Sequence, residues 1–409
     1  MNIRSITTFY DPALVGTIPP LDVLGQFAAA AKGALQQQGY PVQSLRLATS
    51  PFPGWAASLA SDDMAALAVD LEKLAAVRGF NYLSLGPADP NRPVSYLAIP
   101  SILAAAESVF ATGLMTAGGG RVSLPAVRAC AEIITQAAKI SPDGFTNLRF
   151  AALGNVPSGS PFLPSAYHSA GAPPAVALAV ESADLALEVF KQATSLESAR
   201  RVLLNQLEEH AIHLQKAMAA PCQQFGVRFL GLDYSLAPYP SETCSSGAAL
   251  ESLGLSRLGL FGTLAAAAFL ADTLDRGNWV RSGFNGLMLP VMEDSTLAVR
   301  AAEGSLTVRD LLMVSAVCGT GLDTIPLPGE ATAAQLAAVL LDVAVMSQRL
   351  DKPLTARLMP IPGKTAGDRT DFEFEFFANS RVMALNAEPL SGLFAGDEII
   401  DFHPRARNI

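Results

Sequence analysis

Cysteine is scarce in this chain of 409 residues. Its four cysteines, Cys130, Cys222, Cys244 and Cys318, lie far apart and form no CxxC pair. This spacing excludes a zinc ribbon and a dithiol redox motif, and reduced thiols in a cytoplasm are the simplest expectation. A signal peptide is not expected either, because the first residues lead into a strand pattern without an apolar secretory segment.

Charge is also sparse: charged residues make up 16% of the chain, with a net charge of -9 and no basic patch. This balance argues against nucleic acid and anionic membrane surfaces as partners. The uncharged apolar run Leu258–Ala271 is shorter than the roughly 20 residues of a membrane-spanning helix, so a buried helix is expected there. The hydrophobic fraction of 50%, rich in alanine, instead predicts helices packed closely on a sheet, or a sizeable interface in a homo-oligomer.

Apolar strand-like runs and helix-like periodic stretches alternate from one end of the chain to the other. The expected strands cover 3–9, 44–48, 81–85, 148–153, 175–180, 227–233, 284–291, 354–359 and 372–377, and the clearest helices cover 63–77, 124–139, 195–225, 247–253 and 331–350. Several strands are continuous apolar runs, which is typical of strands buried on both faces of a parallel sheet. Without a linker or a repeat, residues 1–409 are predicted to form a single α/β barrel domain of about ten strands, with antiparallel strands at the C-terminus.

Six motifs follow one another in order: GNVPSGSPFLPSAYH (154–168), GLDYSLAPYP (231–240), GLFGT (259–263), LMLPVMEDS (287–295), VCGTGLDTIPLPG (317–329) and ARLMPIPG (356–363). Together they resemble the uncharacterised family called domain of unknown function 711, or uncharacterised protein family 0210. The resemblance implies the α/β barrel of the pyruvate formate-lyase-like fold, but no known reaction. Glycyl-radical chemistry does not follow, because Ala384 and Leu385 stand where radical-bearing relatives have glycine and an aromatic residue.

Polar residues come just after, or at the end of, several expected strands. They are Asn155, His168, Asp233, Ser235, Glu293, Asp294 and Lys364. If the strands are parallel, the loops that carry these residues share one rim, where α/β barrels keep their active sites. A buried strand that ends in an acid and is followed by a Ser-rich helix start is typical of a small-molecule site.

Five of the side chains are candidates for catalysis. His168 is a candidate general base, or a ligand of a divalent metal with Asp233 or Glu293; alternatively it is a loop histidine bonded to backbone. Asp233, Glu293 and Asp294 are candidate acids and bases or ligands of a hard cation, although carboxylates before a helix also serve as caps. Cys318 is a candidate nucleophile, but no histidine adjoins it in sequence, and buried thiols are usually inert.

Three Gly- or Ser-rich segments, 116–125, 241–250 and 259–267, lead into expected helices. Unpaired N–H groups at helix starts attract carboxylate or phosphate, although capping alone is the alternative at any one of them. The candidate binding residues are Arg121, Ser245, Ser246, Gly247, Gly262 and Thr263, together with Asn155, Ser235 and Lys364. Gly363-Lys364-Thr365 lacks the upstream glycine of a P-loop, and no segment matches GxGxxG, so a nucleotide cofactor is not expected.

These features favour an enzyme that acts on a small carboxylate- or phosphate-bearing metabolite by acid–base chemistry, as a lyase, hydrolase or isomerase. A ligand-binding or regulatory protein with the same anion pocket is the first alternative, because binding needs the same donors. An oligomeric scaffold is the second, and it predicts that the polar residues do not converge.

Overall fold

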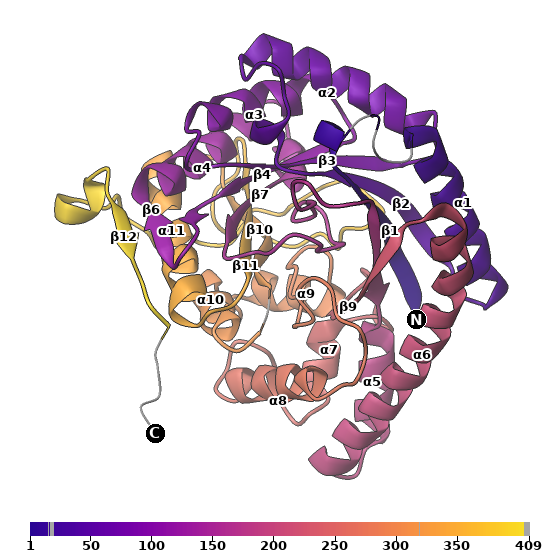
Figure 1. The fold of residues 1–409 in the computed structure, drawn as a ribbon. Helices are drawn as coiled ribbons and strands as arrows, with labels where there is room; N and C mark the ends of the chain where they lie inside the picture. The colour runs from indigo at the N-terminus through magenta and orange to yellow at the C-terminus, as the bar shows by residue number, and fades with distance from the viewer. Residues whose placement is uncertain (15, 17–19, 319, 405–409) are drawn as a thin grey trace.

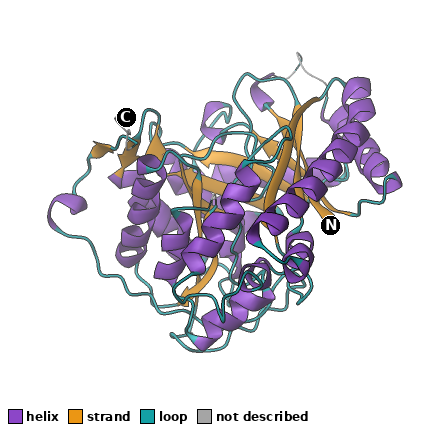
Figure 2. Cartoon of the chain, turned by 90° about the horizontal axis from the view of Figure 1, so that it is seen from below, coloured by secondary structure: helices purple, strands orange, loops and turns teal. Residues whose placement is uncertain are grey.

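A large central sheet with helices around it forms the body of the protein, as Figure 1 and Figure 2 show. The computed structural model describes residues 1–14, 16, 20–318 and 320–404. In these ranges nine strands form one sheet in the order β10-β11-β7-β4-β3-β2-β1-β8-β9. Their bounds are β1 Asn2–Tyr10, β2 Val42–Thr49, β3 Tyr82–Ala88, β4 Val109–Leu114, β7 Phe150–Gly154, β8 Ala175–Glu181, β9 Arg228–Ala237, β10 Gly321–Pro328 and β11 Leu354–Ile361. A smaller sheet joins β5 Thr116–Ala117, β6 Arg121–Ser123 and β12 Ile399–Asp401.

The sheet is mostly parallel but runs in two directions. Strands β1, β2, β3, β4 and β7 are parallel to their neighbours in this group. Strand β8 is antiparallel to β1, and β11 is antiparallel to β7. The outermost strands β9 and β10 are parallel to β8 and β11, respectively. The two groups of strands run in opposite directions, so their carboxyl ends do not lie on the same side of the sheet along the strand direction.

The segment 280–292 lies between the two outermost strands, β9 and β10. Leu232 of β9 forms a bridge with Arg281, and Asp323 of β10 forms a bridge with Pro290. Backbone hydrogen bonds add to these bridges: Met288 N–H donates to Ser235, and Val291 N–H donates to Asp323, at 2.9 and 3.1 Å. The segment thus hydrogen-bonds to both edges without forming a regular strand.

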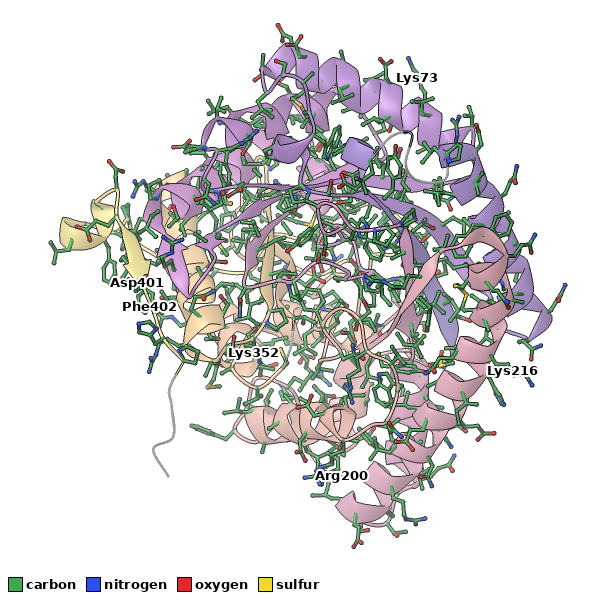
Figure 3. All side chains as sticks on the ribbon, viewed as in Figure 1. Lys73, Arg200, Lys216, Lys352, Asp401 and Phe402 are labelled. Carbon is green, nitrogen blue, oxygen red and sulfur yellow. The ribbon has the colours of Figure 1, made fainter. Side chains whose placement is uncertain are left out.

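The helices present alanine-rich faces to the sheet and begin at residues that cap them. Ser195 caps α6, and Thr332 with Gln335 forms a capping box at the start of α11. Lys73 on α2 and Lys216 on α6 lie on the outer surface, away from the strands (Figure 3). In the described ranges no helix has both the length and the apolar character needed to cross a membrane. The helices are α1 Leu21–Gln37, α2 Ser61–Ala76, α3 Val94–Ala105, α4 Leu124–Ala137, α5 Ala183–Gln192, α6 Leu196–Phe225, α7 Ser246–Glu251, α8 Thr263–Asp275, α9 Ser295–Glu303, α10 Val308–Ser315 and α11 Ala333–Arg349.

Two predicted strands are wrong, and two strands of the large sheet were missed, together with the three short strands of the small sheet. Residues 284–291 are irregular, and residues 372–377 form no strand, because their phenylalanines pack in an aromatic cluster on Phe145. The C-terminal antiparallel pairing is instead made by β12 with β6. The missed strands of the large sheet are β4, a short apolar run after a helix, and β10, which contains two prolines. Proline is tolerated in β10 because this strand lies at the end of the sheet order.

Candidate functional site

A cavity of about 740 Å³ lies where β1, β2 and β3 begin and where β9 ends. Strands β10 and β11 and the 288–293 segment form further walls, and residues 374–376 of the C-terminal segment contribute as well. The cavity is lined by eight charged side chains. Four of them lie on strands: Arg4 of β1, Arg46 of β2, Asp323 of β10 and Arg357 of β11. The other four are Glu107, Arg149, Glu293 and Glu375.

Four of these charged groups form a buried ion-pair network. Glu293 accepts hydrogen bonds from Arg4 at 2.6 Å and from Arg357 at 2.7 Å. Arg357 also pairs with Asp323 at 2.6 Å, and Arg4 lies 3.5 Å from Glu181. Because both oxygens of Glu293 are engaged by guanidinium groups, this carboxylate fixes the positions of two arginines that come from different strands.

Arg46 is the guanidinium that this network leaves out. Its Nε donates to Ser44 Oγ at 2.9 Å, and its charge lies over the Tyr82 ring, 5.9 Å from the centroid. Among the described residues, neither terminal nitrogen has a hydrogen-bond acceptor, and no carboxylate pairs with Arg46. Burial, and next the nearby Arg4, lower the pKa of Arg46 to about 9. Arg46 is therefore a positive charge in the cavity without a direct carboxylate partner.

Aromatic and apolar side chains form the rest of the wall. Tyr82 packs edge-to-face on Phe110, with ring centroids 5.5 Å apart. On the other side, Phe376 lies beneath the Arg4 guanidinium at 5.7 Å and contacts Phe374 at 5.2 Å. Two arginines of the cavity, Arg46 and Arg149, have no carboxylate partner among the described residues, but the Arg149 guanidinium donates to the carbonyls of Leu103, Ala106 and Val109. The cavity thus combines charged groups with aromatic and apolar walls, which is a common composition of a small-molecule site.

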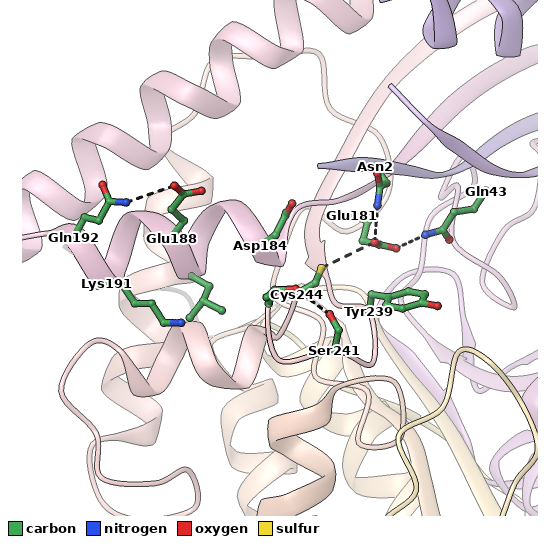
Figure 4. A pocket seen from close by; sticks show the side chains of 12 residues that line it. Asn2, Gln43, Glu181, Asp184, Glu188, Lys191, Gln192, Tyr239, Ser241 and Cys244 are labelled. Carbon is green, nitrogen blue, oxygen red and sulfur yellow. Dashed lines mark hydrogen bonds between the residues drawn. The ribbon is translucent and has the colours of Figure 1, made fainter. Parts of the chain in front are cut away.

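A second cavity of about 570 Å³ adjoins the first at Gln43, which lines both. Figure 4 shows Glu181 between Asn2 and Gln43, whose side-chain amides donate to its carboxylate at 3.2 and 2.5 Å. Burial raises the pKa of Glu181, although Arg4 and these amides oppose the shift. Every carboxylate oxygen of Glu181 already has a partner, so this side chain forms part of the wall between the cavities.

The polar residues predicted to share one rim are divided in the structure. The premise of a single parallel set of strands is wrong, since β7 and β9 run in opposite directions. Asn155 follows β7 and donates to Asp351, whereas Asp233 and Ser235 lie inside β9. His168 lines a smaller cavity of about 340 Å³, and Glu293 lines the large one.

The contacts of His168 match the alternative of a loop histidine bonded to backbone. Its Nε2 lies 3.2 and 3.1 Å from the carbonyls of Ala172 and Pro173, and its ring stacks on Phe9. Burial lowers its pKa, although these carbonyls oppose the shift. In the described part of the chain no three His, Cys, Asp or Glu side chains gather as metal ligands, so His168, Asp233 and Glu293 do not form the suggested metal site.

Asp233 holds the 280–292 segment against β9. Its carboxylate accepts from the Ser235 hydroxyl and from the N–H groups of Phe284 and Asn285, the last two at 2.7 and 2.9 Å. Burial raises its pKa to about 6, against the effect of these donors. A Cβ at Gly283 would lie 2.1 Å from this carboxylate, so the approach needs glycine. These contacts give Asp233 a structural role, which is to hold the 280–292 segment against β9.

Asp294 joins the starts of two helices. It caps α9 through Thr296 and Leu297, and it accepts from Gly247 N–H at 3.0 Å. It also accepts from Ser245 Oγ at 2.6 Å. The helix start at 245–247 is therefore satisfied by Asp294, and Ser246 Oγ donates to a carbonyl of β9. These serines and Gly247 do not line the large cavity.

The remaining candidates also lie away from the cavity. Gly262 and Thr263 begin α8, where Thr263 Oγ1 donates to Leu260. Arg121 is exposed on β6, and Lys364 pairs with exposed Asp371 at 3.0 Å. Cys318 is buried and lies three residues after the end of α10. It does not line the small cavity that contains His168.

Of the charged residues in the large cavity, sequence reasoning found Glu293 but missed the four arginines and Asp323. For those on strands, the signal was a charged residue inside a strand whose neighbours are apolar, as in SLRLA around Arg46 and TARLM around Arg357. Charged side chains are seldom fully buried unless they are paired or bind a ligand, so this pattern marks a functional or ion-pair position.

Comparison with known proteins gives one family. A family model described as "Uncharacterised ACR (DUF711)" matches residues 19–379. Among curated proteins, the chain is similar to a UPF0210 protein of Pyrobaculum aerophilum, with 36% identity over 61% of this chain and 56% of the relative. It is 32% identical to a UPF0210 protein of Pyrobaculum arsenaticum, over 84% of this chain and 78% of the relative. A UPF0210 protein of Neisseria gonorrhoeae is 28% identical, over 84% and 79%. The first of these alignments spans little more than half of the relative's length, and none of the names states a function.

Proposed function

Because this chain belongs to the Uncharacterised ACR (DUF711) family, whose description assigns no activity, we propose a function from the cavity itself. The protein binds a small carboxylate- or phosphate-bearing molecule, and the Arg46 guanidinium is the group that holds the anion. The observation that carries this proposal is the absence of any carboxylate partner for Arg46 among the described residues, at a position inside a cavity of about 740 Å³.

Physical chemistry favours an anion at this place. A guanidinium stays protonated in proteins, so the lowered pKa of Arg46 expresses an unfavourable charge rather than a neutral side chain. An anion in the cavity would supply the missing partner and the acceptors for two terminal nitrogens. Arg4 and Arg357 are already paired with Glu293, Glu181 and Asp323, so among these three arginines Arg46 is the one left to pair with an anion.

The test measures ligand-induced stabilisation in the wild type and in Arg46→Met. Inorganic phosphate and acetate are the probes, followed by a panel of phosphorylated and carboxylated metabolites. A bound ligand at one hundred times its Kd should raise the free energy of unfolding by about 2.7 kcal/mol. We expect this gain in the wild type and its loss in Arg46→Met.

Arg200→Met is the matched control, because Arg200 also lies over an aromatic ring, at 4.8 Å from Phe269, but outside the cavity. This variant should keep the ligand response. Arg46→Met should also leave the ligand-free protein as stable as the wild type or more stable, since it removes an unpaired charge. Equal ligand responses in wild type and Arg46→Met would refute the proposal.

We propose an acid–base enzyme acting on the same anion as the second candidate. Burial raises the pKa of Asp323, although its ion pair with Arg357 opposes the shift, and this carboxyl lines the anion cavity. A carboxyl with a raised pKa beside a binding site is a candidate proton donor or acceptor. Exchange of carbon-bound hydrogens of bound carboxylates in D2O, followed by NMR and lost in Asp323→Asn, would support this reading.

We further propose that the sheet closes into a ten-stranded barrel of the pyruvate formate-lyase-like kind and that residues 1–409 form one domain. The bridges from 280–292 to both β9 and β10 support closure. Two stable halves after limited proteolysis would contradict a single domain.

We also propose a reducing cytoplasm as the location, which the four unpaired cysteines support. A homo-oligomer is proposed from the alanine-rich composition, and light scattering would check it.

A further inference from the structure

The anion cavity is much larger than the anion it would hold. Its volume of about 740 Å³ falls within the range of roughly 300–1,000 Å³ that is typical of sites for drug-sized ligands. A carboxylate or phosphate group alone would occupy the neighbourhood of Arg46 and leave most of this volume to water. The nature of the remaining wall therefore carries information about the rest of the ligand.

That wall is aromatic on the side next to Arg46. The guanidinium lies over Tyr82, and Tyr82 packs edge-to-face on Phe110, so cation and rings form one continuous surface. Phe162 and Met288, both buried, add apolar atoms to the same cavity. Water against such a surface is readily displaced by an apolar ring, whose burial is favourable in proportion to its area.

A second aromatic group faces the cavity from the C-terminal segment. Phe374 contacts Phe145 at 5.0 Å and Phe376 at 5.2 Å, both edge-to-face. Phe374 and Phe376 are only half-buried, whereas Phe372 and Phe377 of the same aromatic cluster are buried. Their accessible ring surface lines the cavity.

From these observations we propose that the ligand is an anion that carries a planar apolar ring, of the aromatic carboxylate or aryl phosphate class. Its anionic group pairs with Arg46, and its ring lies against the aromatic wall made by Tyr82 and Phe110. This inference rests on the proposed anion-binding function and specifies the chemistry of the ligand at the same site.

The experiment compares ligands that differ only by the ring. Calorimetry measures phenylacetate against acetate, and phenyl phosphate against inorganic phosphate, with the neutral phenylacetamide as a third probe. We expect each ring-bearing anion to bind at least tenfold more tightly than its parent, with a negative heat-capacity change. Phenylacetamide should bind at least tenfold more weakly than phenylacetate, because it lacks the charge. The two pairs also distinguish a carboxylate from a phosphate ligand.

Substitutions separate the ring from the anion. Phe110→Leu should reduce the preference for the ring at least threefold while the affinity for acetate stays constant, whereas Arg46→Met should abolish binding of both. Phe269→Leu is the control, because Phe269 is a half-buried ring beneath an arginine outside the cavity. Circular dichroism checks that each variant is folded. If Phe110→Leu does not fold, Tyr82→Leu replaces it as the variant of the aromatic wall.

The outcomes distinguish this inference from the proposed function. Equal affinities for acetate and phenylacetate, both dependent on Arg46, would refute the proposal that the ligand carries a ring. The same result would still support an anion site at Arg46. Phenylacetate binding that survives Arg46→Met would overturn the inference, because the ring would then bind elsewhere. No binding of any probe would overturn both.

Discussion

Replacing Glu293 by glutamine should be one of the more destabilising single changes in this protein, because this carboxylate is the shared partner of two buried arginines. Glu293 receives Arg4 at 2.6 Å and Arg357 at 2.7 Å, and all three side chains are about nine-tenths buried. Glutamine keeps the shape but not the charge, so both guanidinium groups lose one of their two carboxylate partners. Removing one member of a buried ion pair typically costs about 3–5 kcal/mol.

The expected change in melting temperature follows from the size of the chain. With 409 residues and an unfolding entropy of about 2.1 cal/mol/K per residue, the total is about 0.86 kcal/mol/K. A loss of about 3–5 kcal/mol then lowers Tm by about 4–6 °C. Differential scanning calorimetry measures this shift, and urea denaturation of the same samples checks the free energy independently.

Glu303→Gln is the matched control. Glu303 also contacts two arginines, Arg300 at 3.0 Å and Arg257 at 3.7 Å, but it is 41% exposed. Surface pairs of this kind contribute about 0–1 kcal/mol, so Tm should fall by about 1 °C at most. If Glu293→Gln and Glu303→Gln lower Tm equally, the buried network does not hold the arginines as we argue.

Three further predictions concern residues outside the cavity. Asp294→Ala should cost about 2–4 kcal/mol in urea denaturation, because it removes the α9 cap and leaves a buried N–H of α7 without an acceptor; a loss below 1 kcal/mol would contradict this. Asp233 has a pKa of about 6 in the folded protein, above the ordinary 3.8. Between about pH 4 and 6 the folded protein therefore binds this proton more tightly than the unfolded chain does, so the contribution of Asp233 to stability falls as pH rises, by at most about 1.4 kcal/mol per pH unit. Asp233→Asn should remove that component, so an unchanged pH profile would count against it. Gly231→Ala should destabilise by at least about 2 kcal/mol, since φ is +130° and a Cβ would lie 2.4 Å from the carbonyl of Val280, whereas Gly39→Ala, with φ of +82° and open space, should cost about 1–2 kcal/mol.

Local sequence signals were sufficient for most elements. The helix predicted over 195–225 is α6 Leu196–Phe225, because Ser195 supplies a cap and Gly226 adopts the left-handed conformation that ends it. The continuous apolar run 175–180 is strand β8, buried along its whole length. Elsewhere, as in the proline-containing strand β10 or the alternating phenylalanines of 372–377, the neighbours in space decided the structure.

The candidate site was predicted only in part. Glu293 was recognised as an acid after an apolar run, but the choice between catalysis and capping could not be made from the chain. The structure separates it from its neighbour: Asp294 caps a helix, whereas Glu293 turns into the cavity and binds two arginines. Adjacent side chains at the start of a helix point in different directions, and only the packing around them shows where each one goes.

By itself, the sequence determined that strands and helices alternate, that the strands are buried, and that the chain belongs to one family. Tertiary structure alone decided the direction of each strand and hence which polar residues meet. A buried apolar run has the same composition whether it runs up or down the sheet, so nothing local distinguishes β7 from β9. Arg4, Arg46 and Arg357 are separated by up to hundreds of residues, and they share one cavity because β1, β2 and β11 bring them there.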